Sequence, residues 1–128
     1  MFNEIVLEHF RNPHNAGELA NANATVEVTN PVCGDILRLS ARVEQNSIAE
    51  IRFKTQGCVA AIAASSVLTD MLTGKSSKQA REITADLVSR SLGNLPPASF
   101  HAAQLCVDAV TVLLRKFPAD QRLGRDEH

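Results

Sequence analysis

The sequence has almost no excess charge, no long apolar run and no basic leader, and each absence excludes a class of protein. Its 13 Lys and Arg against 14 Asp and Glu leave a net charge of −1, so nothing indicates nucleic acid or an acidic membrane surface as a partner. No apolar run approaches the roughly 18 residues of a membrane span, so we expect no membrane association. The first residues include Glu4 and Glu8 and no basic segment, so we expect no secretory signal and a cytoplasmic location.

Cysteine is also scarce, and the three that occur, Cys33, Cys58 and Cys106, are an odd number. Without an export signal, a disulfide framework is a poor interpretation. Thiols in a reducing compartment act either as small buried hydrophobic groups or as chemical groups, so the question is which of the three is which. The sequence contains no catalytic triad, phosphate loop or dinucleotide fingerprint, so we do not expect a self-sufficient enzyme.

The spacing of apolar residues predicts a short helix and then strands in the first half of the chain. Residues 1–12 have the three- and four-residue spacing of a helix, which Pro13 ends. Alternating apolar and polar residues then predict three strands, with a turn at 45–47 between the last two; the strands are 25–29, 35–44 and 49–54.

Helical patterns fill the second half. An apolar stripe predicts a helix after Gly57, with Gly74 as its C-cap and a buried face made of Val59, Ile62, Ala63, Val67 and Met71. Capping patterns at Ser76 and Thr84 predict two short helices. The segment LPP at 95–97 predicts a rigid extended stretch before a last helix, which covers 99–116.

These patterns together predict one domain over residues 1–117 and a polar, flexible tail over 118–128. The fold class that we expect is α+β, a small three-stranded antiparallel sheet with helices packed on one face.

Two of the cysteines lie where the predicted strands begin or end. Cys33 is in the segment NPVCGD at 30–35, where Gly34 allows a tight loop in which the thiolate and Asp35 can face one ion. Cys58 follows a strand and a glycine at the start of a helix, where the helix dipole and free backbone amides stabilise a thiolate. A plain turn cysteine and a space-filling cysteine at a strand–helix joint remain the alternatives.

The predicted hairpin brings Cys33 and Cys58 together, because the outer ends of its strands return to the same edge of the sheet. Two soft ligands and one carboxylate suit zinc, or iron with sulfide. His101, at the start of the last helix, is a further candidate ligand, although a lone histidine there is more often solvated or packed. His9, on the apolar stripe of the first helix, and His14, in a loop, are weaker candidates.

Four segments, in order, resemble the NifU/IscU-type scaffold family: EHFRNPHNAG at 8–17, NPVCGD at 30–35, FKTQGC at 53–58 and LPP at 95–97. The resemblance covers roughly residues 3–117 and implies a small antiparallel sheet with helices packed on it. It also implies a scaffold that accepts sulfur as persulfide from a pyridoxal-phosphate-dependent cysteine desulfurase. Such a scaffold combines the sulfur with iron into a [2Fe–2S] cluster and releases the cluster to acceptor apo-proteins.

The resemblance also implies ligands, which in the family are three cysteines, an aspartate and a histidine. The motifs place four of these ligands at Cys33, Asp35, Cys58 and His101. The third cysteine of the family directly follows the histidine, where this chain has Ala102. Cys106 is either a displaced ligand or a core thiol on the apolar side of the last helix, and we favour the core thiol. We expect a persulfide on Cys58 or Cys33, with Cys58 preferred.

A second departure concerns partners. Residues 95–99 read LPPAS, where the IscU branch continues with valine and lysine in a stretch that serves chaperone recognition. This difference argues against dependence on the dedicated Hsp70-type chaperone, and it removes a charge beside the site.

The sequence leaves three candidate functions. The first, which we favour, is a scaffold for assembly and transfer of [2Fe–2S] clusters rather than an enzyme. The second is a zinc-bound sulfur-transfer partner of a cysteine desulfurase, as in the SufU branch, and Zn²⁺ is the alternative occupant of the isolated protein. The third is a diverged metal-binding protein that assembles nothing, for which the absent third cysteine is the best support.

Overall fold

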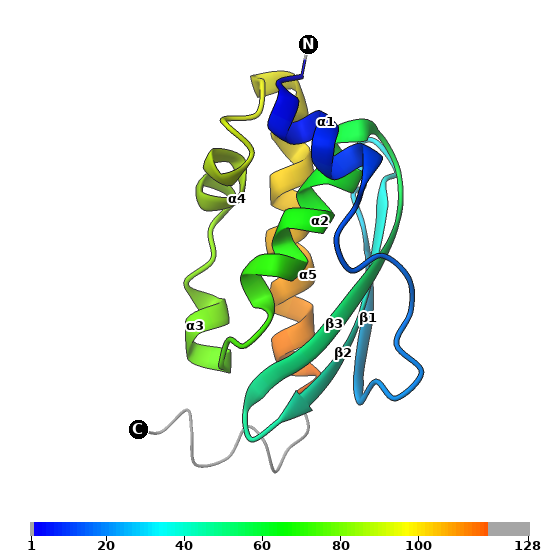
Figure 1. Ribbon diagram of the computed structural model, residues 1–128, viewed down its shortest axis with the longest axis vertical. Helices are drawn as coiled ribbons and strands as arrows, with labels where there is room; N and C mark the ends of the chain where they lie inside the picture. The colour runs from blue at the N-terminus through cyan, green and yellow to red at the C-terminus, as the bar shows by residue number, and fades with distance from the viewer. Residues whose placement is uncertain (1, 118–128) are drawn as a thin grey trace.

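The computed structural model describes residues 2–117 of the chain. Its elements follow in the order α1 (Glu4–Arg11), β1 (Ala24–Thr29), β2 (Ile36–Glu44), β3 (Ser47–Gln56), α2 (Val59–Leu72), α3 (Ser77–Arg81), α4 (Ala85–Ser91), the 3₁₀ helix η1 (Pro97–Ser99) and α5 (His101–Arg115). The strands form one antiparallel sheet in the order β1-β2-β3, and the helices lie on one side of it (Figure 1). The predicted α+β class is therefore confirmed. The tail predicted at 118–128 lies outside the described residues.

A tight turn closes the hairpin of β2 and β3. Gln45 and Asn46 have positive φ angles of 52° and 62°, as both central residues of a type I′ turn do. At the far end of the hairpin, Ile36 pairs with Gln56. The residues just before β2 and just after β3 therefore meet at one edge of the sheet, as the strand pattern predicted.

Two helices pack directly on the sheet, α2 against β3 and α5 against β1 and β2, while α1 and α4 pack against these two helices. The largest fully buried side chains come from every layer, and burying each contributes about 1.5–3 kcal/mol. They are Val6, Leu37, Leu39, Val43, Ile48, Ile51, Leu68, Leu72, Leu92, Leu105, Leu113 and Phe117. This shared core fixes the first turns of α2 and α5 beside the same end of the hairpin.

The buried stripe predicted for α2 is wrong in detail. Of its five residues only Ala63 and Val67 are buried, whereas Val59, Ile62 and Met71 are partly exposed. Most of the surface of α2 is buried instead, because α1, α4, α5 and β3 all contact it. A helix that neighbours surround on several sides does not carry one narrow apolar face.

The predicted helix caps agree more closely with the structure than the predicted stripe of α2 does. Ser76 begins α3 with a complete capping box, and the Thr84 hydroxyl caps α4. Gly74, with φ 83°, lies one residue beyond the C-cap of α2 rather than at it. Pro96 is extended as predicted, but Pro97 already begins η1, so a 3₁₀ turn leads into α5.

By length and composition alone, the segment Pro97–Arg115 could cross a membrane, contrary to the expectation from the sequence. Its apolar side chains pack against β1, β2 and α2, with Leu105, Ala109 and Leu113 fully buried. The core helix of a globular domain passes the same test, so the segment is weak support for a membrane span.

Candidate metal centre

One asparagine closes the loop that carries Cys33. The buried Asn30 accepts hydrogen bonds at Oδ1 from the backbone N–H groups of Val32 (2.8 Å) and Cys33 (3.3 Å). Its own N–H donates to the carbonyl of Asp35, and its carbonyl accepts from the N–H of Gly34, both at 2.8 Å. Gly34 has a φ of 79°, which glycine adopts without steric cost. These bonds curl the loop, so the exposed thiol of Cys33 and the carboxylate of Asp35 lie at the same end of the sheet.

Cys58 follows β3 directly and is the N-cap residue of α2. Its side chain makes no capping hydrogen bond, so the thiol is not engaged by the helix. The sulfur lies 3.6 Å from Oδ2 of Asp35 and 3.9 Å from Nε2 of His101. His101 is the first residue of α5, and its Nε2 lies 3.6 Å from the same oxygen of Asp35. The sheet edge and two helix starts thus supply one shared site.

All four residues predicted as ligands converge in the structure. Ligand atoms of Cys33, Asp35 and His101 lie within 4.8 Å of one another, and Cys58 contacts the last two. In a tetrahedral site with metal–ligand distances of about 2.0–2.3 Å, neighbouring ligand atoms lie about 3.3–3.8 Å apart. The contacts of Cys58 at 3.6 and 3.9 Å therefore need to contract only slightly to enclose one ion.

Exposure differs sharply within this set. Asp35 is 8% exposed, whereas both cysteines are exposed and His101 is half-buried. The carboxylate therefore forms the floor of the site, and the thiols form a rim that is open to solvent.

Position 57 must be a glycine, because the carboxylate of Asp35 lies directly against its backbone. A Cβ atom at position 57 would lie 2.6–2.9 Å from the carboxylate atoms of Asp35, which is too close for any real contact. A side chain there would move the carboxylate away from Cys58 and His101. The sequence interpretation overlooked this role and that of Asn30, although Asn–Pro is a turn signal and a glycine beside a candidate ligand indicates close approach.

Cys106 and Ala102 lie in the core, 1% and 0% exposed. Burial raises the pKa of the Cys106 thiol to about 12, so this sulfur is protonated at neutral pH. A buried neutral thiol is a poor metal ligand, because the thiolate is the form that binds.

The chain as a whole matches a known family. Residues 1–123 match the family model described as the NifU-like N terminal domain. The chain belongs to this family. The resemblance first seen in four short motifs is thereby confirmed over nearly the whole NifU-like chain.

Relatives of this NifU-like chain are named for one process. "Iron-sulfur cluster assembly scaffold protein IscU 1" of Archaeoglobus fulgidus is 43% identical over 110 residues, which cover 86% of this chain and 72% of the relative. The protein named "Iron-sulfur cluster assembly scaffold protein IscU" in Aquifex aeolicus is 40% identical over 128 residues, which cover 98% and 80%.

A solved structure supports the fold. It is that of a proposed iron–sulfur cluster assembly scaffold protein for the SUF system of Fervidobacterium islandicum, with a TM-score of 0.72 over 88% of this chain and 96% of that one. At 18% identity this likeness concerns the NifU-like fold alone.

Proposed function

We propose that this chain is a scaffold on which iron–sulfur clusters are assembled. The observation that carries the proposal is the convergence of three kinds of ligand at one place. The exposed thiol of Cys58 lies 3.6 Å from the Asp35 carboxylate and 3.9 Å from the His101 imidazole. Cys33 lies beside the same carboxylate and imidazole. Family membership and the scaffold names of the relatives support it. An exposed rim of thiols suits a cargo that is received and passed on, in contrast to the closed sphere of a structural ion.

The cluster type that fits the donor set is [2Fe–2S]. Four side chains, Cys33, Asp35, Cys58 and His101, supply two ligands to each iron, and histidine replaces cysteine on iron in other two-iron centres. Because only two of the four are thiolates, we expect the cluster to be held weakly and transferred readily to acceptor apo-proteins. The cluster is the cargo of this protein rather than its resident cofactor.

The sulfur source that we propose is a persulfide on a cysteine desulfurase, with Cys58 as the acceptor. The Cys58 thiolate attacks the outer sulfur of the donor persulfide. The donor S–S bond breaks, a new S–S bond forms on Cys58, and the donor cysteine leaves as a thiolate, so no net oxidation occurs. Alkylation and mass spectrometry after incubation with the desulfurase and cysteine should place the label on Cys58; label on Cys106 alone would contradict the proposal.

A zinc-bound sulfur-transfer partner is the second candidate, because the spacing of Asp35, Cys58 and His101 also fits a single tetrahedral ion. Such a protein would hold one zinc ion tightly and raise the rate of the desulfurase when added to it. Either way the chain acts as a carrier, and the reaction that releases sulfur belongs to its partner.

The deciding experiment is anaerobic reconstitution with iron, cysteine and a cysteine desulfurase, followed by assays of iron and acid-labile sulfide per chain. We expect about two irons and two sulfides in the wild type and in Cys106→Ala, and a large loss in Cys58→Ala. Cluster in the wild type but not in Cys106→Ala would make Cys106 a displaced ligand. No cluster in any variant would reject the scaffold and leave the zinc partner or a diverged, non-assembling protein.

A cytoplasmic location and independence from the dedicated Hsp70-type chaperone stay predictions. The second is tested by adding the chaperone during cluster transfer to an acceptor apo-protein. Transfer at an unchanged rate is expected, because residues 95–99 lack the lysine of the IscU branch.

A further inference from the structure

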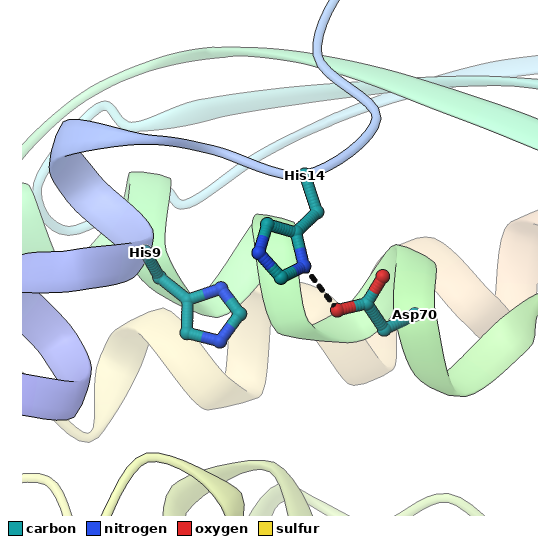
Figure 2. Close-up of side chains that lie close together, drawn as sticks. All are labelled: His9, His14 and Asp70. Atoms are coloured by element: carbon teal, nitrogen blue, oxygen red, sulfur yellow. Dashed lines mark hydrogen bonds and ion pairs between the residues drawn. The ribbon is translucent and has the colours of Figure 1, made fainter.

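A second group of metal-binding side chains lies near the other end of α2. His9 of α1, His14 of the following loop and Asp70 of α2 offer ligand atoms within 4.8 Å of one another. Figure 2 shows the His14 ring between the His9 ring and the Asp70 carboxylate, and the two ring centroids lie 4.6 Å apart. At about 1.5 Å per residue, Asp70 lies about 18 Å along the helix from Cys58, so this group is separate from the cysteine site.

Hydrogen bonds already fix both rings. The Ser66 hydroxyl lies 2.8 Å from Nδ1 of His9 and accepts the backbone N–H of His14 at 2.8 Å. Nδ1 of His14 lies 2.5 Å from Oδ2 of Asp70, whose other oxygen accepts from Asn15. The Ser66 bond holds His9 as the second nitrogen of a metal-binding histidine is typically held, which sets the tautomer and the orientation of the ring. The Asp70 carboxylate instead bonds the nitrogen of His14 that faces it, so an ion shared by these two groups would replace that hydrogen bond, with the two atoms moving to about 3.3 Å apart.

The Ser66 bond leaves Nε2 of His9 for another partner. Within residues 2–117 this nitrogen has no hydrogen-bond partner. Burial and the neighbouring His14 lower the pKa of His9, which favours the neutral imidazole that binds metals. His9 is half-buried while His14 and Asp70 are exposed, so an ion can reach the group from solvent and keep a water ligand.

We propose that His9, His14 and Asp70 form a second site for a divalent transition metal of the zinc type. Two imidazoles and one carboxylate are the donors that zinc prefers after thiolates, and the set leaves a fourth position open. A bound ion would join α1 and its following loop to α2 and so stabilise the N-terminal segment. The inference does not depend on the scaffold function, since none of its residues belongs to the cysteine site.

The test titrates Zn²⁺ alone into the metal-free, full-length protein in competition with a chromophoric chelator. We expect two zinc ions per wild-type chain and one in the variant Cys33→Ser/Cys58→Ser/His101→Gln, which lacks three ligands of the first site. Adding His14→Gln to that variant should abolish the remaining binding. Adding Asp70→Asn, which keeps one oxygen in place, should weaken it by about 10-fold or more.

Circular dichroism and thermal unfolding establish that each variant is folded before its stoichiometry is counted. In the wild type, zinc should also shift the imidazole NMR signals of His9 and His14. The proposal is overturned if the folded triple variant binds no zinc at tens of micromolar. It is equally overturned if His14→Gln leaves the binding unchanged, or if zinc shifts only the His101 signals.

Discussion

At the scale of single residues, the cysteine site depends on a position where no side chain fits. Gly57 lies against the carboxylate of Asp35, and a methyl group there would lie within 2.9 Å of three of its atoms. We predict that Gly57→Ala displaces Asp35 and lowers the affinity of the site for Zn²⁺ or Co²⁺ by about 10- to 100-fold, the usual effect of disturbing a ligand's position. Competition with a chelator measures this affinity.

Asp35→Ala provides the matched control, because it removes the carboxylate with which the new methyl group would clash. If Gly57 acts through Asp35, the double variant should bind no more weakly than Asp35→Ala alone, since residues in contact are not additive. A double variant that loses the sum of both effects would show that Gly57 acts by another route.

Reactivity should separate the three cysteines. Cys33 and Cys58 are exposed, whereas Cys106 is 1% exposed and its pKa is raised to about 12 by burial. We predict that iodoacetamide at pH 8 modifies the first two in the native protein and spares Cys106, since the thiolate is the reactive form. Mass spectrometry counts the adducts, and all three should react in urea. Rapid native labelling of Cys106 would show that it reaches the surface.

At the scale of elements, the loop before β2 owes its shape to Asn30. Asn30→Ala removes the acceptor of the Val32 and Cys33 amides, which we expect to lower the free energy of unfolding by about 1–2 kcal/mol. Because Cys33 is then held loosely, the variant should also lose iron after reconstitution. Urea unfolding and iron assays measure the two effects.

Asn23 offers the control for this prediction. Its side chain also makes two hydrogen bonds to backbone, with the N–H and the carbonyl of Val43, but far from the cysteines along β2. Asn23→Ala should therefore cost similar stability and leave the iron content unchanged. Equal iron loss in both variants would attribute the effect to general destabilisation.

The sequence predicted elements best where local chemistry decides them. Period-two alternation found the hairpin, and Ser76 and Thr84 marked two helix starts, because strands and caps depend on neighbouring residues. It failed where tertiary packing decides, as in α2, which is buried against four other elements. It also missed the 3₁₀ turn at Pro97, since the geometry before α5 depends on how that helix docks.

The sequence likewise predicted only those parts of the candidate sites that local geometry decides. Closure of the hairpin brought Cys33 and Asp35 toward Cys58 by strand geometry alone. His101 was a weak candidate from its position at a helix start and became a predicted ligand through the resemblance, because no periodicity places the start of α5 beside that edge. The group of His9, His14 and Asp70 could not be predicted, since Asp70 meets the histidines only after α1 has docked on α2.

At the scale of the whole molecule, the cysteine site joins segments from across the chain. Asp35 precedes β2, Cys58 begins α2 and His101 begins α5, so a bound ion ties the sheet to both central helices. Such a site exists only in the folded chain, and binding free energy therefore adds to the free energy of unfolding.

We accordingly predict that metal removal lowers the melting temperature. At free zinc about 100-fold above the dissociation constant, one site adds about 2.7 kcal/mol. For a domain of this size that corresponds to an increase of about 10 °C, which EDTA should reverse. Differential scanning calorimetry of the metal-free and zinc-loaded protein measures the change.

Variants show how much of this increase in melting temperature comes from the cysteine site and how much from the histidine site. Cys33→Ser/Cys58→Ser should lose the part due to the cysteine site, and His14→Gln the part due to the histidine site. Because about 18 Å of helix separates the two sites, the losses should be additive. A zinc-induced increase that survives in the variant carrying all three substitutions would mean that zinc binds this fold somewhere other than these two sites.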